Sequence, residues 1–299
     1  MSTRSIILGG LLAALVVLDG GPAARAQPAA DRAVLARFES ARALAIDPTG
    51  RLYVADAGRD VVYVLDRQGA ERAALGSPGT RAGEFDGPEG LDPTNGQALL
   101  VADAGNGRVQ RFSAEWQYLE ALPIGRSVGA PEQRVFDDGR DGADVQGDGR
   151  PVAVATTDGG DLYVLDERAG AVVTFDAQRR PDPIVGAAGE LQEPVAIALD
   201  DGTLYVADAG RRAVFRYGRF GTFQGRLPLP DLPAPRALTV HRGRLWVVCA
   251  DRIVVWDPAT ETRRVHRVPL PGPLVGAVGW KGTLFALTDR QLVRLPGWE

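Results

Sequence analysis

Arginine follows aspartate at six places along the chain, and this recurrent pair is the most regular source of chemistry in the sequence. An aspartate after a short apolar stretch stands at positions 56, 103, 166, 208, 251 and 289. The arginines just after it, here called the six turn arginines, are Arg59, Arg108, Arg168, Arg211, Arg252 and Arg290. Gathered at one end of a fold, guanidinium groups would bind carboxylates or phosphates bidentately. The other interpretation is that each arginine neutralises its own aspartate at a solvated rim.

A candidate cation site lies between Asp144 and Gly149. Asp144 and Asp148 match the start of a calcium loop, in which oxygen ligands alternate and glycine makes the turn. Gln146 replaces the usual Asp or Asn, and two later ligand positions hold apolar residues. One interpretation is therefore a calcium site formed by Asp144, Gln146 and Asp148. The other is an acidic loop without a metal.

Other catalytic arrangements have little support in the sequence. The chain has two histidines, His241 and His266, and two asparagines, Asn95 and Asn106. It contains no Ser–His–Asp order, no Cys–His pair and no phosphate-binding loop. The single cysteine, Cys249, excludes an internal disulfide, and we assign it no role because it lies in an apolar run.

The aspartate–arginine pairs recur because the chain repeats one strand–turn–strand pattern. The clearest copy is 99–112, and 52–59 and 204–211 are nearly identical to its first half. Each copy has an apolar strand, then aspartate with small residues in a tight turn, then a second strand. Six such repeats of about four strands each predict an all-β fold, a six-bladed β-propeller of four-stranded blades.

The last repeat reaches Glu299 before it can supply a fourth strand, whereas Val34–Phe38 precedes the first repeat and has no blade of its own. We expect Val34–Phe38 to pair with Gln291–Leu295 as the outer strand of the last blade. This pairing closes the ring and leaves no open sheet edge.

The repeat also resembles a known one. Phe85, Pro88, Gly90 and the run from Leu100 to Phe112 are similar to the NHL repeat. The similarity is strong in the first, second and fourth repeats, weaker in the fifth and sixth and poor in the third, and the repeats together cover about 34–299. The resemblance implies a six-bladed propeller that binds peptides, proteins or RNA, serves as a sensor ectodomain or, in a few cases, acts as a lyase. Such lyases need several histidine ligands, and lactonase-type propellers use Glu, Asn and Asp, sets that this sequence supplies poorly.

The geometry of a meander sorts the connections between two ends of the propeller. With strands a to d numbered outward from the channel, the b–c turns and the d–a crossovers share one end, and the a–b and c–d turns share the other. The six turn arginines are then expected at one end, beside the crossovers 76–86 and 126–151. His241 falls in an a–b turn and His266 in an outer strand, so we expect neither at the channel mouth among the arginines.

Residues 1–26 are typical of a secretory signal: Arg4 is followed by the apolar run Ile6–Leu18 and by Ala24-Arg25-Ala26. The alternative is an uncleaved anchor, although the apolar run is short for a transmembrane helix. We expect an exported, periplasmic or extracellular protein with its propeller over 27–299 and no membrane insertion after cleavage. The net charge of −4 argues against nucleic-acid binding.

Two function classes remain open. The first is a non-catalytic exported scaffold whose arginine-rich end binds a protein, a peptide or a small anionic ligand, with calcium as the one candidate cofactor. The second is a metal-assisted lactonase or lyase with an unfamiliar set of ligands. A metal bound in the central channel would favour the second class.

Overall fold

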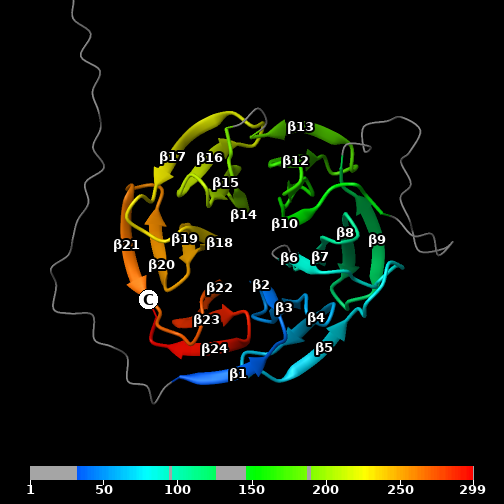
Figure 1. Ribbon diagram of the computed structural model, residues 1–299, viewed down its shortest axis with the longest axis horizontal. Helices are drawn as coiled ribbons and strands as arrows, with labels where there is room; N and C mark the ends of the chain where they lie inside the picture. The colour runs from blue at the N-terminus through cyan, green and yellow to red at the C-terminus, as the bar shows by residue number, and fades with distance from the viewer. Residues whose placement is uncertain (1–31, 94–95, 126–145, 187–189, 299) are drawn as a thin grey trace, which may run out of the picture.

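The computed structural model describes residues 32–93, 96–125, 146–186 and 190–298, and all its regular elements over these residues are β-strands. Six antiparallel four-stranded sheets form a ring around a central channel (Figure 1). The predicted six-bladed propeller is therefore confirmed. Within the described ranges, no helix has the length and apolar character to cross a membrane.

Each blade runs outward from the channel through four strands. Blade 1 contains β2 (Ala41–Ile46), β3 (Leu52–Asp56), β4 (Val61–Leu65) and β5 (Glu71–Leu75). Blade 2 contains β6 (Pro88–Asp92), β7 (Ala98–Asp103), β8 (Arg108–Ser113) and β9 (Tyr118–Pro123). Blade 3 contains β10 (Pro151–Thr156), β11 (Leu162–Asp166), β12 (Ala171–Phe175) and β13 (Pro181–Val185). Blade 4 contains β14 (Pro194–Asp200), β15 (Thr203–Asp208), β16 (Ala213–Gly218) and β17 (Phe223–Pro228).

The last two blades follow the same order. Blade 5 contains β18 (Pro235–His241), β19 (Arg244–Cys249), β20 (Arg252–Asp257) and β21 (Thr262–Arg267). Blade 6 contains β22 (Leu274–Trp280), β23 (Thr283–Thr288), β24 (Gln291–Pro296) and, as its outer strand, β1 (Ala33–Arg37). Blade 3 has the full set of strands although its repeat is the poorest in sequence.

The ring is closed by the two ends of the chain (Figure 1). β1 pairs antiparallel with β24, with Ala33 opposite Arg294 and Arg37 opposite Gln291. A bulge falls between Val34 and Ala36. The predicted closure is confirmed: β1 covers the edge of β24 and supplies the fourth strand of blade 6.

The core lies between consecutive blades. Strands β3 and β11 are buried along their whole length. One cluster joins Tyr53 and Val62 of blade 1 to Leu99 and Phe112 of blade 2. Because each blade packs on its neighbours in this way, the framework holds the turns at both ends in fixed positions, where binding residues usually lie.

Candidate functional site

Strand register defines one position at the end of strand b in every blade, here called the corner position. In blades 1 to 4 it is occupied by Asp56, Asp103, Asp166 and Asp208, each opposite the first residue of strand a. In blades 5 and 6 the same place opposite strand a belongs to Cys249 and Thr288. The sequence analysis placed Asp251 and Asp289 at this position, which is wrong by two residues in blade 5 and by one residue in blade 6. The reason is that the b–c turns of these two blades are shorter than those of blades 1 to 4.

The four corner aspartates bind the connection that enters their own blade. Asp56 accepts hydrogen bonds from the backbone N–H groups of Glu39 and Ser40, at 2.9 and 2.7 Å. Asp166 accepts one from Arg150 at 2.9 Å and Asp208 one from Gln192 at 2.6 Å. These carboxylates are thus committed to the backbone, which explains why the repeat needs aspartate there.

Arg108 is a structural residue inside blade 2. Its side chain is 1% exposed and its Nε donates to Asp103 at 2.8 Å. Its Nη2 donates to the carbonyls of Arg81 and Glu84 in the crossover that enters the blade. A buried guanidinium paired in this way stabilises the crossover, and no part of its charge faces the channel mouth.

The other turn arginines also lie at the b–c turns, as their sequence positions predict. Arg252 makes a bidentate pair with Asp251 at 2.7 and 2.9 Å. Arg59 and Arg290 pair loosely with Asp56 and Asp289, at 3.4 and 3.5 Å. Arg168 donates from Nη1 to the carbonyl of Asp148. Arg211 donates its backbone N–H to the carboxylate of Asp208. That the six bind a ligand together stays a prediction.

The candidate calcium loop is only partly described, because Asp144 lies outside the described residues. Gly147 donates its N–H to the carbonyl of Asn106, and Gly149 donates to that of Ile124. The segment that carries Gln146 and Asp148 therefore continues past blade 2 into β10. Calcium binding by Asp144, Gln146 and Asp148 stays a prediction.

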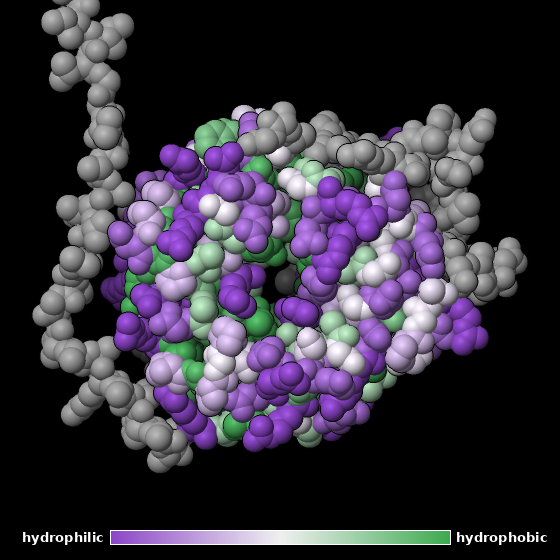
Figure 2. All heavy atoms as spheres, viewed as in Figure 1, coloured by the Kyte–Doolittle hydropathy of each residue, from purple (hydrophilic) through white to green (hydrophobic). Residues whose placement is uncertain are grey.

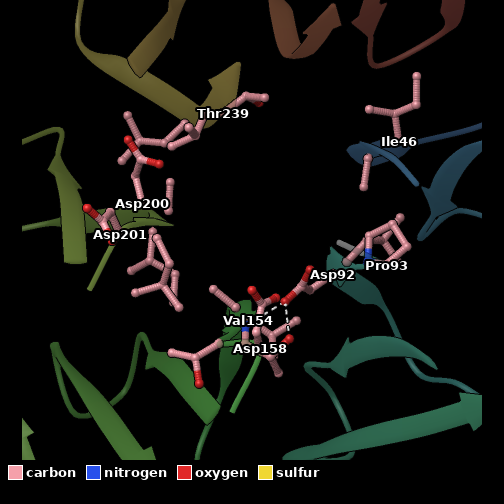
Figure 3. A pocket seen from close by; sticks show the side chains of 18 of the residues that line it. Ile46, Asp92, Pro93, Val154, Asp158, Asp200, Asp201 and Thr239 are labelled. Carbon is pink, nitrogen blue, oxygen red and sulfur yellow. Dashed lines mark hydrogen bonds between the residues drawn. The ribbon is translucent and has the colours of Figure 1, made fainter. Parts of the chain in front are cut away.

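A cavity that sequence reasoning missed opens at the opposite end, where the a–b turns meet the channel. It has a volume of about 540 Å³ and all six inner strands contribute to its wall (Figure 3). Ile46 and Val154 give it apolar walls, whereas Asp92, Asp158 and Asp200 bring carboxylates to it. Figure 2 shows one end of the ring, which is hollowed at its centre. The sequence feature that could have indicated this cavity is an aspartate near the end of strand a in blades 2 to 4: Asp92, Asp158 and Asp200.

The electrostatics of this cavity are dominated by acid. Asp92 is buried and accepts hydrogen bonds from the backbone N–H and the hydroxyl of Thr156, at 2.5 and 2.9 Å. Burial, and then the charge of Asp201, raise the pKa of Asp200. Arg219 also lines the cavity, but its guanidinium pairs with Asp161 of blade 3 at 2.5 Å. The arrangement favours a cationic group with an apolar neighbour.

The histidines and the cysteine serve the packing of blades 5 and 6. His241 packs on Trp246 and His266 packs on Trp298, each with ring centroids 5.0 Å apart. Burial lowers the pKa of both imidazoles and raises that of the Cys249 thiol to about 11. All three groups are therefore uncharged at neutral pH.

Over the described residues, no three His, Cys, Asp or Glu side chains are grouped so that they could hold a metal ion. Asn106, the described asparagine at the arginine-bearing end, is buried and donates to Asp103 and to the carbonyl of Gly79. Its amide is thus occupied by the turn of blade 2. The lactonase or lyase alternative stays a prediction.

No protein-family model matches the chain. Among curated proteins, peptidyl-glycine alpha-amidating monooxygenase A from Xenopus laevis is 30% identical over 214 residues, which are 64% of this chain and 20% of that protein. The chain thus spans about a fifth of the length of this relative. The NHL resemblance accordingly rests on the repeat residues themselves.

Solved structures match over most of the chain. A gluconolactonase from Xanthomonas campestris superimposes with a TM-score of 0.64 at 18% identity, over 89% of each chain. A catalytically inactive virginiamycin B lyase from Staphylococcus aureus gives 0.60 at 12% identity, over 85% of this chain and 79% of the lyase. A nidogen/laminin complex gives 0.59 at 18% identity, over 80% and 85%. At such identities the likeness is one of fold, and the chain shares a propeller architecture found in enzymes and in a protein–protein complex alike.

Proposed function

We propose that this protein is an exported, non-catalytic propeller that binds a protein or peptide partner. The observation that carries the proposal is the open cavity at the a–b end of the channel, with apolar walls and an acidic lining. Concave sites with apolar walls and a few polar groups are the usual form of a binding site. The nidogen/laminin neighbour is a protein–protein complex on the same fold.

The lining indicates the chemistry of the partner. Asp158 and Asp201 are exposed, and Asp200 is half-buried. A lysine or arginine side chain fits such a lining, because its aliphatic stem packs on the walls while its charge meets the carboxylates. Phe220, 86% exposed in the β16–β17 turn beside Arg219, offers an apolar contact at the same end. The preferred ligand is therefore a basic residue flanked by an apolar one.

The arginine-bearing end is a second candidate surface, for an anionic protein, peptide or small ligand. The observation in its favour is that the Arg290–Asp289 pair is long, at 3.5 Å, and both side chains are largely exposed. Exposed pairs of this kind contribute little to stability, so a ligand carboxylate can replace Asp289 at little cost. Arg59 is half-exposed at the same end, between the buried Asp56 at 3.4 Å and the exposed Glu39 at 3.7 Å.

Binding to basic and acidic peptide arrays tests both surfaces. We expect Asp158→Asn combined with Asp201→Asn to weaken binding of basic peptides at least tenfold, whereas Arg59→Ala combined with Arg290→Ala leaves it unchanged. Acidic peptides should respond in the opposite way if the second surface is used. Asp257→Asn, at the end of β20 in blade 5, is the control for a general loss of negative charge. Equal basic-peptide binding by all variants, or metal-dependent opening of a lactone by the wild-type protein, would contradict the proposal.

A further inference from the structure

A second pocket lies at the seam between blades 2 and 3, beside the central cavity. Its volume is about 300 Å³, and it is lined by Gln97, Arg111, Arg179 and the β10–β11 turn from Thr156 to Gly160. Residues 156–159 of this turn also line the central cavity. Gln97, Arg111 and Arg179 line the second pocket and not the central cavity.

Two guanidinium groups in this seam share one carboxylate. Arg111 donates from Nη1 to Glu120 at 3.2 Å, and the Nε of Arg179 lies 3.7 Å from the same oxygen. Arg179 also donates from Nη1 to the carbonyl of Gly160, and its side chain is only 14% exposed. Burial lowers the pKa of Arg179 and the charge of Arg111 lowers it further, against the opposing effect of Glu120. The seam therefore holds a largely buried guanidinium and a partly exposed one around a single carboxylate.

In the seam between blades 4 and 5, the corresponding positions hold two residues of opposite charge, Arg216 and Glu261. Arg216 is the fourth residue of β16, and Arg111 is the fourth residue of β8. Opposite it, Glu261 takes the left-handed position of the c–d turn that Arg179 takes in blade 3, with φ of 54° and 62°. Arg216 and Glu261 approach to 3.5 Å. An arginine faces a glutamate in one seam and another arginine in the other.

The seam between blades 1 and 2 shows the same position filled by an apolar group. Trp116 has φ of 65° in the c–d turn of blade 2, and the guanidinium of Arg51 lies over its ring at 5.4 Å. In these two seams, the buried Nε1 of Trp116 and Nε of Arg216 have no hydrogen-bond partner among the described residues, but neither seam pairs one arginine with another. Only in the seam of blades 2 and 3, of these three, does the c–d turn bring a second positive charge.

We propose that the pocket between Arg111 and Arg179 binds an oxyanion, a carboxylate or a phosphate group of a small ligand. An anion there would balance the second guanidinium and could bridge both arginines with charge-assisted hydrogen bonds. Thr157 lines the same space, and its hydroxyl, which accepts from the Asp161 N–H, has its own proton to donate. Asp158 also lines the pocket, but it is exposed, and no ion pair within 4.0 Å joins it to either described arginine. Water screens its charge far more than that of a buried group.

Thermal unfolding in added anions tests this site on the whole protein. Phosphate and acetate are titrated separately against chloride at constant ionic strength, with wild type, Arg179→Gln and Arg180→Gln. Arg180 is the matched control, because it belongs to the same turn, is exposed and already pairs with Asp176 at 2.6 Å. We expect one oxyanion to raise the melting temperature of wild type and Arg180→Gln and to leave Arg179→Gln unchanged. A response to phosphate alone identifies a phosphate ligand, and a response to acetate alone identifies a carboxylate.

A charge reversal keeps the proposal testable if Arg179→Gln folds poorly. Arg179→Glu reverses the charge beside Arg111 and Glu120. We expect it to lose the response to the oxyanion. Equal melting of wild type in oxyanion and chloride, or a response that survives in Arg179→Glu, would overturn the proposal.

Discussion

Blades 1 to 4 and blades 5 to 6 use the same strand frame but hold their turns differently. In the first group a buried aspartate at the corner position binds N–H groups of the incoming connection, as Asp56 does with Glu39 and Ser40. In the second group Cys249 is a buried thiol, and the hydroxyl of Thr288 accepts from Arg290 and Gln291 of its own turn. The carboxylate is therefore part of a local contact, and the blade itself does not require it.

Proline explains where the aspartate is absent. The corner aspartates receive their bonds from the two residues that precede the first residue of strand a, such as Gln192 in blade 4. In blades 5 and 6 Pro233 and Pro273 fall among these donor positions, and proline has no N–H to give. A buried carboxylate that lacks such donors is costly, so an uncharged residue takes its place.

The largest effect is expected in blade 6, which is completed by the N-terminal strand. Deleting Ala33–Arg37 should abolish the single cooperative unfolding transition, because it exposes the edge of β24 and the apolar cluster around Leu35 and Phe38. The measurement is thermal unfolding followed by circular dichroism. Val34→Ser, at a half-exposed position of the same strand, is the control and should melt close to wild type. A deletion variant that unfolds cooperatively at the wild-type temperature would show that the closure is dispensable.

The next largest effect contrasts the two kinds of turn directly. Asp103→Ala should cost about 3 to 5 kcal/mol, because it leaves Arg108 buried without its carboxylate and removes the acceptor of the Asp86 N–H. Asp251→Ala should cost less than about 1 kcal/mol, since that side chain is 47% exposed and pairs only at the surface. Urea unfolding of both variants measures the difference. Similar losses in the two would mean that the corner position does not matter.

The fold could be predicted from sequence because its signal is repeated. The near-identical copies at 52–59, 99–112 and 204–211 fix strands b and c, and the missing fourth strand of the last repeat leads directly to the closure by β1. Even in blade 3 the apolar spacing survives the loss of the repeat residues. Alignment by aspartate alone failed in blades 5 and 6, because an aspartate in a shortened turn was taken for the corner residue.

The site was harder to predict, because side chains of similar type have opposite surroundings. Arg108 and Arg290 follow an aspartate in the sequence, yet one is buried in an ion pair and the other is largely exposed. The two pockets are built by residues from different repeats, such as Arg111 of blade 2 and Arg179 of blade 3. Only the packing of neighbouring blades brings them together, and their positions along the chain do not indicate that they lie close in space.

A double-mutant cycle sharpens the role of proline. Cys249→Asp should cost about 3 kcal/mol, because it places a carboxylate where Pro233 has no N–H to offer. Adding Pro233→Ala restores a donor, so the double variant should recover about 1 kcal/mol of that loss relative to additivity. Chemical unfolding of the two single variants and the double variant gives the coupling energy. An additive result would mean that the missing donor is not the reason for cysteine at this corner.

The smallest effect concerns pH and again separates the two groups of blades, since both histidines lie in blade 5, packed against aromatic rings. Burial lowers the pKa of His266 in the folded state, so below the ordinary imidazole value of about 6.5 the unfolded chain binds more protons. The stability that this group contributes is complete above that value and is lost as the pH falls through it.

His266→Phe keeps a ring against Trp298 but removes the titration. Between pH 7.5 and pH 5 the variant should therefore lose less stability than wild type. Carboxylates such as Asp200 titrate in both proteins, so the difference between the two pH profiles isolates the imidazole. Parallel profiles would show that His266 is solvated in the folded protein and that its contact with Trp298 does not exclude water.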